Sequence, residues 1–154
     1  MTLTNSRVYG NSTSGSDAGG GGISAGSVTL TNSRVYENST TGVFARGGGI
    51  SAGSLTSVDS TVSGNSSDAA GGGISLTYEG TLTNSTVSGN STSGFSSGGG
   101  GISLDFADFF GNIDGSLTLI NSTVSGNTTT DAIGSAIYIT PGFGFSPVAP
   151  NIDQ

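Results

Sequence analysis

Of the 154 residues only 8% are charged and 32% are hydrophobic, which is too few long apolar side chains to fill the wide core of an ordinary globular domain. The net charge of −7, with three arginines and no lysine, excludes the basic face that nucleic-acid binding requires. The chain has no cysteine or histidine, which excludes disulfides, thiolate chemistry and the commonest metal ligand and general base.

The sequence also bears on location. No apolar run is long enough to span a bilayer, so membrane insertion is not expected. The residues after Met1 have neither the basic nor the apolar region of a signal peptide, and they already belong to a repeat. We therefore expect a piece of a longer protein, secreted or held at the cell surface, whose export signal is not present in this chain.

Two landmarks alternate along the sequence. A motif that ends in asparagine occupies residues 3–11, 30–38, 57–65, 82–90 and 119–127. Between its copies stands a glycine run that ends in isoleucine, at Ile23, Ile50, Ile74 and Ile102, with a weaker copy at Ile137. Strict alternation at intervals of 24 to 28 residues, lengthened to 35 and 37 before the last copies, predicts a repeated structural unit.

Each repeat is predicted to contain three short strands. Residues 28–32 alternate apolar and hydroxyl side chains, which is the period of a strand with one buried face. A bend at Asn32 and Ser33 leads to a second strand around Val35, and Ile50 with Ser51 forms the third. Helix is not expected, because β-branched residues and glycine dominate.

Stacked repeats of this kind predict an all-β fold, a single-stranded parallel β-helix (solenoid) of about five coils of about 25–27 residues. Equivalent residues should then lie one strand spacing apart, roughly 4.8 Å. The predicted interior ladders are Ile23, Ile50, Ile74, Ile102 and Ile137; Leu3, Leu30, Leu82 and Leu119; and Val8, Val35, Val62, Val87 and Val124. A narrow interior explains the low apolar content.

Two segments depart from the repeat. Residues 1–140 form the predicted solenoid, with a loop insertion at residues 104–115. Residues 141–154 form a tail that could cap the last coil, since open solenoid ends expose strand edges. No cap is visible at the amino end, so head-to-tail stacking of copies stays an open alternative.

The paired landmarks, such as Gly47-Gly48-Gly49-Ile50 and Val35-Tyr36-Glu37-Asn38, resemble the repeats of chlamydial polymorphic outer-membrane proteins and of large secreted bacterial β-helix proteins. Valine stands here where that family often has phenylalanine. The resemblance implies right-handed coils, a preference that parallel crossovers share. It also implies a secreted or surface-displayed passenger with adhesive or structural roles.

The asparagines are the most regular polar feature. Asn11, Asn38, Asn65, Asn90 and Asn127 are expected to form a structural ladder whose amides bond from coil to coil. Asn5, Asn32, Asp59, Asn84 and Asn121 are interpreted as a second ladder of the same kind. Several of these asparagines also lie in Asn-x-Ser/Thr motifs for N-glycosylation, which we attribute to the packing of the repeat.

Threonines predict an outward face. Thr2, Thr29, Thr56, Thr81 and Thr118 should form one ladder, and Thr4, Thr31 and Thr83 a second, which Val58 and Ile120 interrupt. Such a Thr-x-Thr grid resembles the ice-binding face of some antifreeze solenoids. Strand propensity explains most of the pattern, so ice binding is an alternative and not the main hypothesis.

The insertion groups aromatic and acidic residues that could form an interaction site. These residues are Phe106, Phe109, Phe110, Asp105 and Asp108. With Asp114, the two aspartates could supply oxygen ligands to calcium, but no known calcium motif matches and no metal site or cofactor is assigned. A loop whose phenylalanines cover part of the core is the favoured interpretation.

A second candidate interaction site lies on equivalent rungs, where Arg7 stacks on Arg34 and Tyr9 on Tyr36; these side chains could bind a sugar or a protein. No pair of carboxylates is placed for hydrolysis, so an enzyme is not expected. The main hypothesis is a non-catalytic structural or adhesive module, whose partners are its own copies or surface and matrix components. A carbohydrate-binding or polysaccharide-degrading β-helix is a further alternative.

Overall fold

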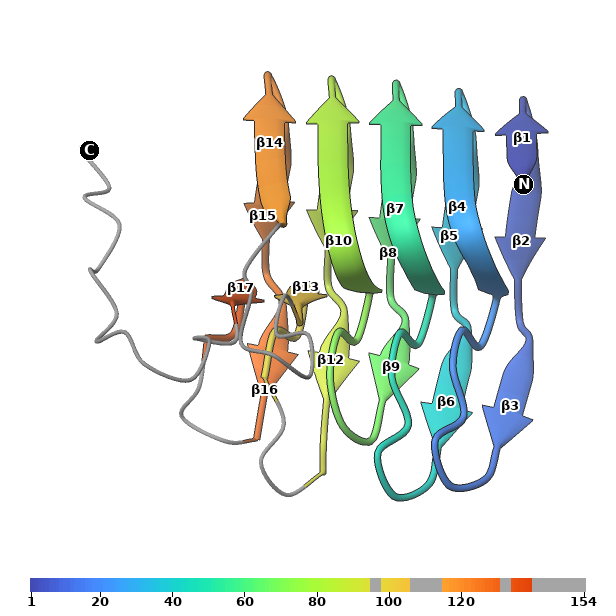
Figure 1. Ribbon diagram of the computed structural model, residues 1–154, viewed down its shortest axis with the longest axis vertical. Helices are drawn as coiled ribbons and strands as arrows, with labels where there is room; N and C mark the ends of the chain where they lie inside the picture. Colours follow the sequence, from blue (N-terminus) through green and yellow to red (C-terminus); the bar gives the residue numbers. More distant parts are fainter. Residues whose placement is uncertain (95–97, 106–114, 131–133, 140–154) are drawn as a thin grey trace.

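The protein is a β-solenoid of about four turns, built from parallel strands that stack coil upon coil. The computed structural model describes residues 1–94, 98–105, 115–130 and 134–139, and within them there is no helix. In Figure 1 the long strands rise in the near layer and the chain descends behind them as the coils advance from the N-terminal end, so the winding is right-handed. The predicted fold class is therefore confirmed, with about four turns in place of about five coils.

Three strands make up each coil. The first two coils contain β1 (Thr2–Thr4), β2 (Arg7–Tyr9), β3 (Ser12–Ser14), β4 (Ile23–Thr31), β5 (Arg34–Tyr36) and β6 (Ser39–Thr41). The next two contain β7 (Ile50–Val58), β8 (Thr61–Ser63), β9 (Ser66–Ser67), β10 (Ile74–Thr83), β11 (Thr86–Ser88) and β12 (Ser91–Thr92). The last strands are β13 (Ile102–Leu104), β14 (Ser116–Ile120), β15 (Thr123–Ser125), β16 (Thr128–Thr129) and β17 (Ile137–Ile139).

The strands form three parallel sheets. The long-strand sheet runs β1-β4-β7-β10-β13-β17, with β14 also paired to β10. The valine sheet runs β2-β5-β8-β11-β15, and the short-strand sheet runs β3-β6-β9-β12-β16. Because consecutive strands of one sheet come from successive coils, the register of the repeat becomes the register of the sheet.

The predicted interior ladders are confirmed. Ile23 pairs with Ile50, and the series continues through Ile74 and Ile102 to Ile137. The valines pair in the same way from Val8 to Val124. The leucine ladder includes Ser57 in the third coil, where its hydroxyl contacts that of Ser85 at 3.1 Å. The inner members of these ladders form one continuous buried core, and Leu3, Val8, Val124 and Ile137 at its ends are partly buried. Leu119, predicted to be interior, is 38% exposed, because the last coil covers it less than the coils before it.

The division into strands differs from the prediction in two places. The expected isoleucine strand and leucine strand are one strand, β4, because the alternation of inward and outward side chains only shifts at Gly26 and Ser27. The third strand is instead the segment after the closing asparagine, such as β6. It escaped sequence reasoning because its inward residue, Thr40, is a buried hydroxyl and not an apolar side chain.

The insertion interrupts a long strand. β13 ends at Leu104 and β14 begins at Ser116, and both pair with β10, the single strand beneath them. The chain thus leaves the long-strand sheet halfway along a rung and returns to the same rung. The predicted tail at 141–154 lies outside the described residues.

Each coil turns at single residues in the left-handed backbone region. Between β5 and β6 this residue is Glu37, with φ of 54°, whereas the equivalent position holds Gly10, Gly64, Gly89 or Gly126 in the other coils. A side chain in this region costs about 1–2 kcal/mol, which glycine avoids. At this corner the second coil therefore carries local strain that the equivalent corners of the other coils lack.

Glu37→Gly is expected to raise the free energy of unfolding by about 0.5–1 kcal/mol, because relief of the left-handed strain outweighs the extra freedom of glycine in the unfolded chain. Glu37→Ala keeps the Cβ and is the matched control, for which no such gain is expected. Urea unfolding followed by circular dichroism measures both. An equal gain in the two variants would show that removal of the charge, and not of the strain, is responsible.

Candidate functional site

The closing asparagines form a continuous ladder through the interior of the turn between the valine sheet and the short-strand sheet. The backbone N–H of Asn38 and its side-chain amide both donate to Oδ1 of Asn65, each at 3.0 Å. Asn65 donates in turn to Oδ1 of Asn90 at 2.9 Å, and Asn90 to Oδ1 of Asn127 at 2.9 Å. At the other end Asn11 donates to Asn38 at 2.9 Å.

Each amide of the ladder also binds backbone carbonyls. Nδ2 of Asn65 lies 3.0 Å from the carbonyl oxygen of Val35 in the preceding coil and 3.1 Å from that of Ser63. Asn38, Asn65 and Asn90 are at most 1% exposed. Because the amides of these three asparagines are already paired and solvent is excluded from them, this part of the ladder is structural.

A ladder of serines, which sequence reasoning missed, also joins successive coils by hydrogen bonds, at the corner between the long-strand sheet and the valine sheet. The backbone N–H of Ser33 donates to Oγ of Ser60 at 3.0 Å, and that of Ser60 to Oγ of Ser85 at 3.2 Å. Oγ of Ser60 in turn donates to the carbonyl of Val58 at 2.7 Å. The signal was the serine that follows Asn or Asp in every repeat.

The second asparagine ladder differs from the first. Asn5, Asn32, Asp59, Asn84 and Asn121 all have φ between 47° and 51° and are exposed. Their side chains touch only in pairs, for example Asn84 Nδ2 to Asp59 Oδ1 at 3.1 Å. Asparagine and aspartate tolerate the left-handed conformation better than most residues, so these positions form the corner through their backbone and not through buried amides.

Arginine and tyrosine come together on the outer face of the valine sheet. Arg7 pairs with Arg34 and Tyr9 with Tyr36 in adjacent strands, as predicted. The two tyrosine rings stack with centroids 5.0 Å apart and planes within 4° of parallel. Both arginines are exposed, and neither forms an ion pair with any described residue. We call this group the Arg/Tyr patch.

The predicted threonine face is in register. Thr2, Thr29, Thr56, Thr81 and Thr118 occupy equivalent positions of successive long strands. Thr31 pairs with Thr4 on one side and with Val58 on the other, and Thr83 pairs with Ile120. The first ladder is therefore continuous, and the second is broken at two rungs as the sequence indicated.

The insertion is anchored at its start by an ion pair. A guanidinium nitrogen of Arg46 lies 2.8 Å from a carboxylate oxygen of Asp105, and both side chains are partly exposed. Arg46 precedes β7 and Asp105 follows β13, so the ion pair spans β10, the strand that lies between these two. The other predicted residues of this segment, Phe106, Phe109, Phe110, Asp108 and Asp114, lie outside the described residues.

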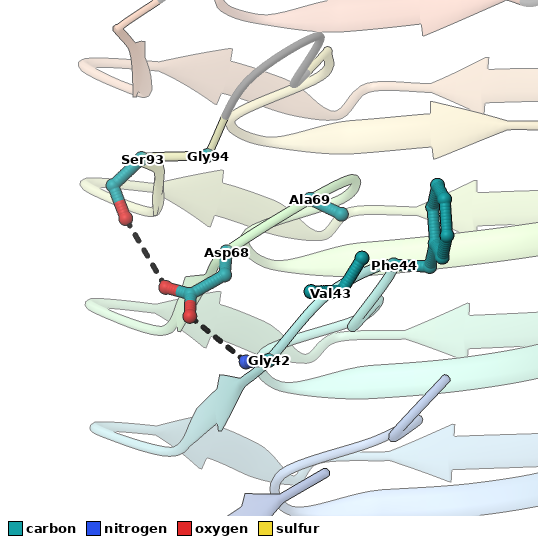
Figure 2. A pocket seen from close by; sticks show the side chains of 7 residues that line it. All are labelled: Gly42, Val43, Phe44, Asp68, Ala69, Ser93 and Gly94. Carbon is teal, nitrogen blue, oxygen red and sulfur yellow. Dashed lines mark hydrogen bonds between the residues drawn. The ribbon is translucent and has the colours of Figure 1, made fainter. Parts of the chain in front are cut away.

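An open hollow of about 520 Å³, which sequence reasoning did not predict, lies beside the loops after the short strands. Figure 2 shows the carboxylate of Asp68 between two neighbours: it accepts the N–H of Gly42 at 2.9 Å and the hydroxyl of Ser93 at 3.3 Å. Val43 and Phe44, 64% and 63% exposed, line the rim. Both oxygens of the Asp68 carboxylate are thereby engaged by the neighbouring loops.

The described ranges contain no cluster of three or more acidic, histidine or cysteine side chains that could hold a metal ion. They also contain no helix with the length and apolarity required to cross a membrane. A scan against protein-family models, a search of curated proteins and a search of solved structures each found no match to this chain.

Proposed function

We propose that this chain is a non-catalytic structural and adhesive repeat module of a secreted or surface-displayed bacterial protein. The observation that carries the proposal is the unbroken hydrogen-bonded ladder from Asn11 to Asn127, which ties every coil to the next. A rod whose buried asparagines bond from each coil to the next is suited to hold its outer faces at fixed positions. The resemblance of its repeats to those of bacterial surface proteins supports the location.

The first coil supplies a reason for self-association. The residues that flank β1 bond to the second coil: the N–H of Asn5 donates to the carbonyl of Thr31 at 3.0 Å, and the carbonyl of Met1 accepts the N–H of Thr29 at 2.9 Å. Successive residues of the strand alternate in direction between them. The N–H groups of Thr2 and Thr4 consequently point away from the second coil, toward an edge without a described strand. Such an edge is a template for one more rung, and for the 154-residue chain taken by itself the occupant we propose is a second copy of this chain.

Purified wild-type protein is therefore expected to assemble into filaments that electron microscopy and sedimentation velocity detect. Thr4→Pro removes an outward N–H and places a ring at the edge, so it should abolish assembly while leaving the coils folded. Thr4→Ala keeps the N–H and is the control. A wild-type protein that stays monomeric at high concentration, or a proline variant that still forms filaments, would contradict end-to-end association.

The non-catalytic part of the proposal has its own test. Incubation of the protein with polygalacturonate and with neutral polysaccharides is expected to release no reducing ends. Release above the level of a heat-denatured control would show that the chain is an enzyme.

Ice binding is the second candidate, because the first threonine ladder is continuous over five rungs at one strand spacing, roughly 4.8 Å. Thermal hysteresis of the purified protein decides between the candidates. If the threonine face binds ice, hysteresis should be present and should fall strongly in Thr56→Leu, which disturbs the middle rung. Absence of hysteresis at high protein concentration removes this candidate.

A further inference from the structure

Two of the three cations of this acidic chain lie next to each other on the outer face of the valine sheet. Arg7 and Arg34 occupy paired positions of β2 and β5, about one strand spacing apart. Like charges at paired positions repel, and no described acid neutralises them, whereas the third arginine, Arg46, is bound to Asp105. The pair is therefore complementary to an external anion that can lie between the two guanidinium groups.

The stacked tyrosines add an aromatic surface beside this charge. Tyr36 packs on Tyr9 through one face of its ring, while its partner on the other side is Ser63 of the third coil. A serine side chain is too short to cover a phenol ring, so no described ring stacks on the second face of the half-buried Tyr36. Stacking on Tyr9 holds that ring in place before any ligand arrives, which reduces the entropy lost on binding.

Hydroxyl groups continue the same face beyond the ring. In the next coils the outward positions that follow Arg34 and Tyr36 are Thr61 and Ser63, and then Thr86 and Ser88. Glu37 is exposed and its Cγ lies 4.0 Å from the position that a Cβ on Gly64 would take, so it extends over the third coil. Charge, an aromatic face and hydrogen-bonding groups thus follow one another on one flat surface.

We propose that the Arg/Tyr patch binds an acidic oligosaccharide built from uronic acid units. The sugar carboxylate binds the guanidinium groups of Arg7 and Arg34, in the bidentate manner that suits arginine. A pyranose ring stacks on the open face of Tyr36, and its hydroxyls bond to Ser63 and Glu37. The proposal rests on the adhesive part of the proposed function, for which it names a ligand. The structural part does not depend on it, because the coils stack without this ligand.

Titration of the full chain with tetragalacturonate, followed by calorimetry, tests the proposal. Wild-type protein is expected to bind, and its dissociation constant should rise about tenfold or more in Arg34→Gln and in Tyr36→Ser. Tyr36→Ser introduces the residue that the next coil carries at the equivalent position, Ser63, so the strand pairing is expected to be preserved. Binding should also weaken as salt is raised, because the charges are exposed.

Arg46→Gln and Tyr78→Ser are matched controls, since they remove an arginine and an exposed tyrosine that lie away from the patch. They are expected to bind as the wild type does. Absence of binding, equal loss in the controls, or equal affinity for neutral cellotetraose would each overturn the proposal. Far-UV circular dichroism measures folding and electron microscopy measures assembly, both independently of glycan binding. Wild-type protein that is folded and forms filaments but does not bind the glycan would reject the glycan site and retain the structural role.

Discussion

Asn65→Asp is expected to lower the free energy of unfolding by about 3–5 kcal/mol at neutral pH, the cost of a buried charge without a partner. The asparagine amide faces the carbonyl oxygens of Val35 and Ser63 and Oδ1 of Asn90, all within 3.1 Å. A carboxylate of the same shape would place negative charge against these three acceptors in a site that is 1% exposed. Urea unfolding of the variant and the wild type measures the difference.

The pH dependence of this variant follows from the same contacts. Burial against acceptors raises the pKa of the introduced carboxyl above its unfolded value of about 3.9. The folded state then binds a proton at a higher pH than the unfolded state, so the penalty is full above the raised pKa and shrinks as pH falls through it. The deficit relative to the wild type should therefore be smaller near pH 4 than at pH 7.

Asn5→Asp is the matched control, because Asn5 is exposed and its Oδ1 accepts the amide of Asn32, a role that a carboxylate keeps. Its effect should stay within about 0.5 kcal/mol at either pH. If Asn65→Asp were as mild as the control, or showed no dependence on pH, the ladder would not be the internal support that the geometry indicates.

Gly72→Ala is expected to destabilise the fold by about 3 kcal/mol, through overpacking that cannot relax. A Cβ on Gly72 would lie 2.2 Å from the carbonyl oxygen of Ser91 and 2.5 Å from that of Gly100. Both atoms belong to the backbone: Ser91 is the first residue of β12, and Gly100 lies in the glycine run that precedes β13. Neither can move without breaking the stacking of coils, so thermal unfolding should occur at a markedly lower temperature.

Gly26→Ala separates this steric effect from the general cost of replacing glycine. No heavy atom lies within 4 Å of a Cβ at Gly26, and its φ is not positive. The substitution should be neutral or should stabilise by about 0.4–1 kcal/mol, because alanine reduces the freedom of the unfolded chain. Similar losses in the two variants would mean that close backbone approach does not explain the glycine runs.

Much of the architecture could be predicted because the alignment of the sequence repeats is also the register in which their strands pair. The alignment of Val35 with Val62 in the sequence is the same alignment that the strands show, so one correct match predicted every rung. The division into strands failed at Gly26 and Ser27, where the alternation shifts within one continuous strand. Thr40 was missed because a buried hydroxyl does not differ from an exposed one in sequence.

The candidate sites were predictable to a lesser extent. The stack of Tyr9 on Tyr36 followed directly from the repeat, since paired positions of adjacent strands must touch. The ion pair of Arg46 with Asp105 did not, because it crosses a coil and joins residues at unrelated positions of the repeat. The hollow beside Asp68 likewise depends on three loops that differ in length and composition.

The sequence alone determined which residues share a rung, because equal spacing in a solenoid becomes equal height along its axis. Only the tertiary structure decided which polar residues are inside. Asn65 and Asn84 look alike in sequence, yet one is buried with its amide fully bonded and the other is an exposed left-handed corner. At one corner the left-handed residue is Gly64, which precedes Asn65, and at the other it is Asn84 itself. The side chain that follows a left-handed residue turns inward, and the left-handed residue's own side chain stays outside.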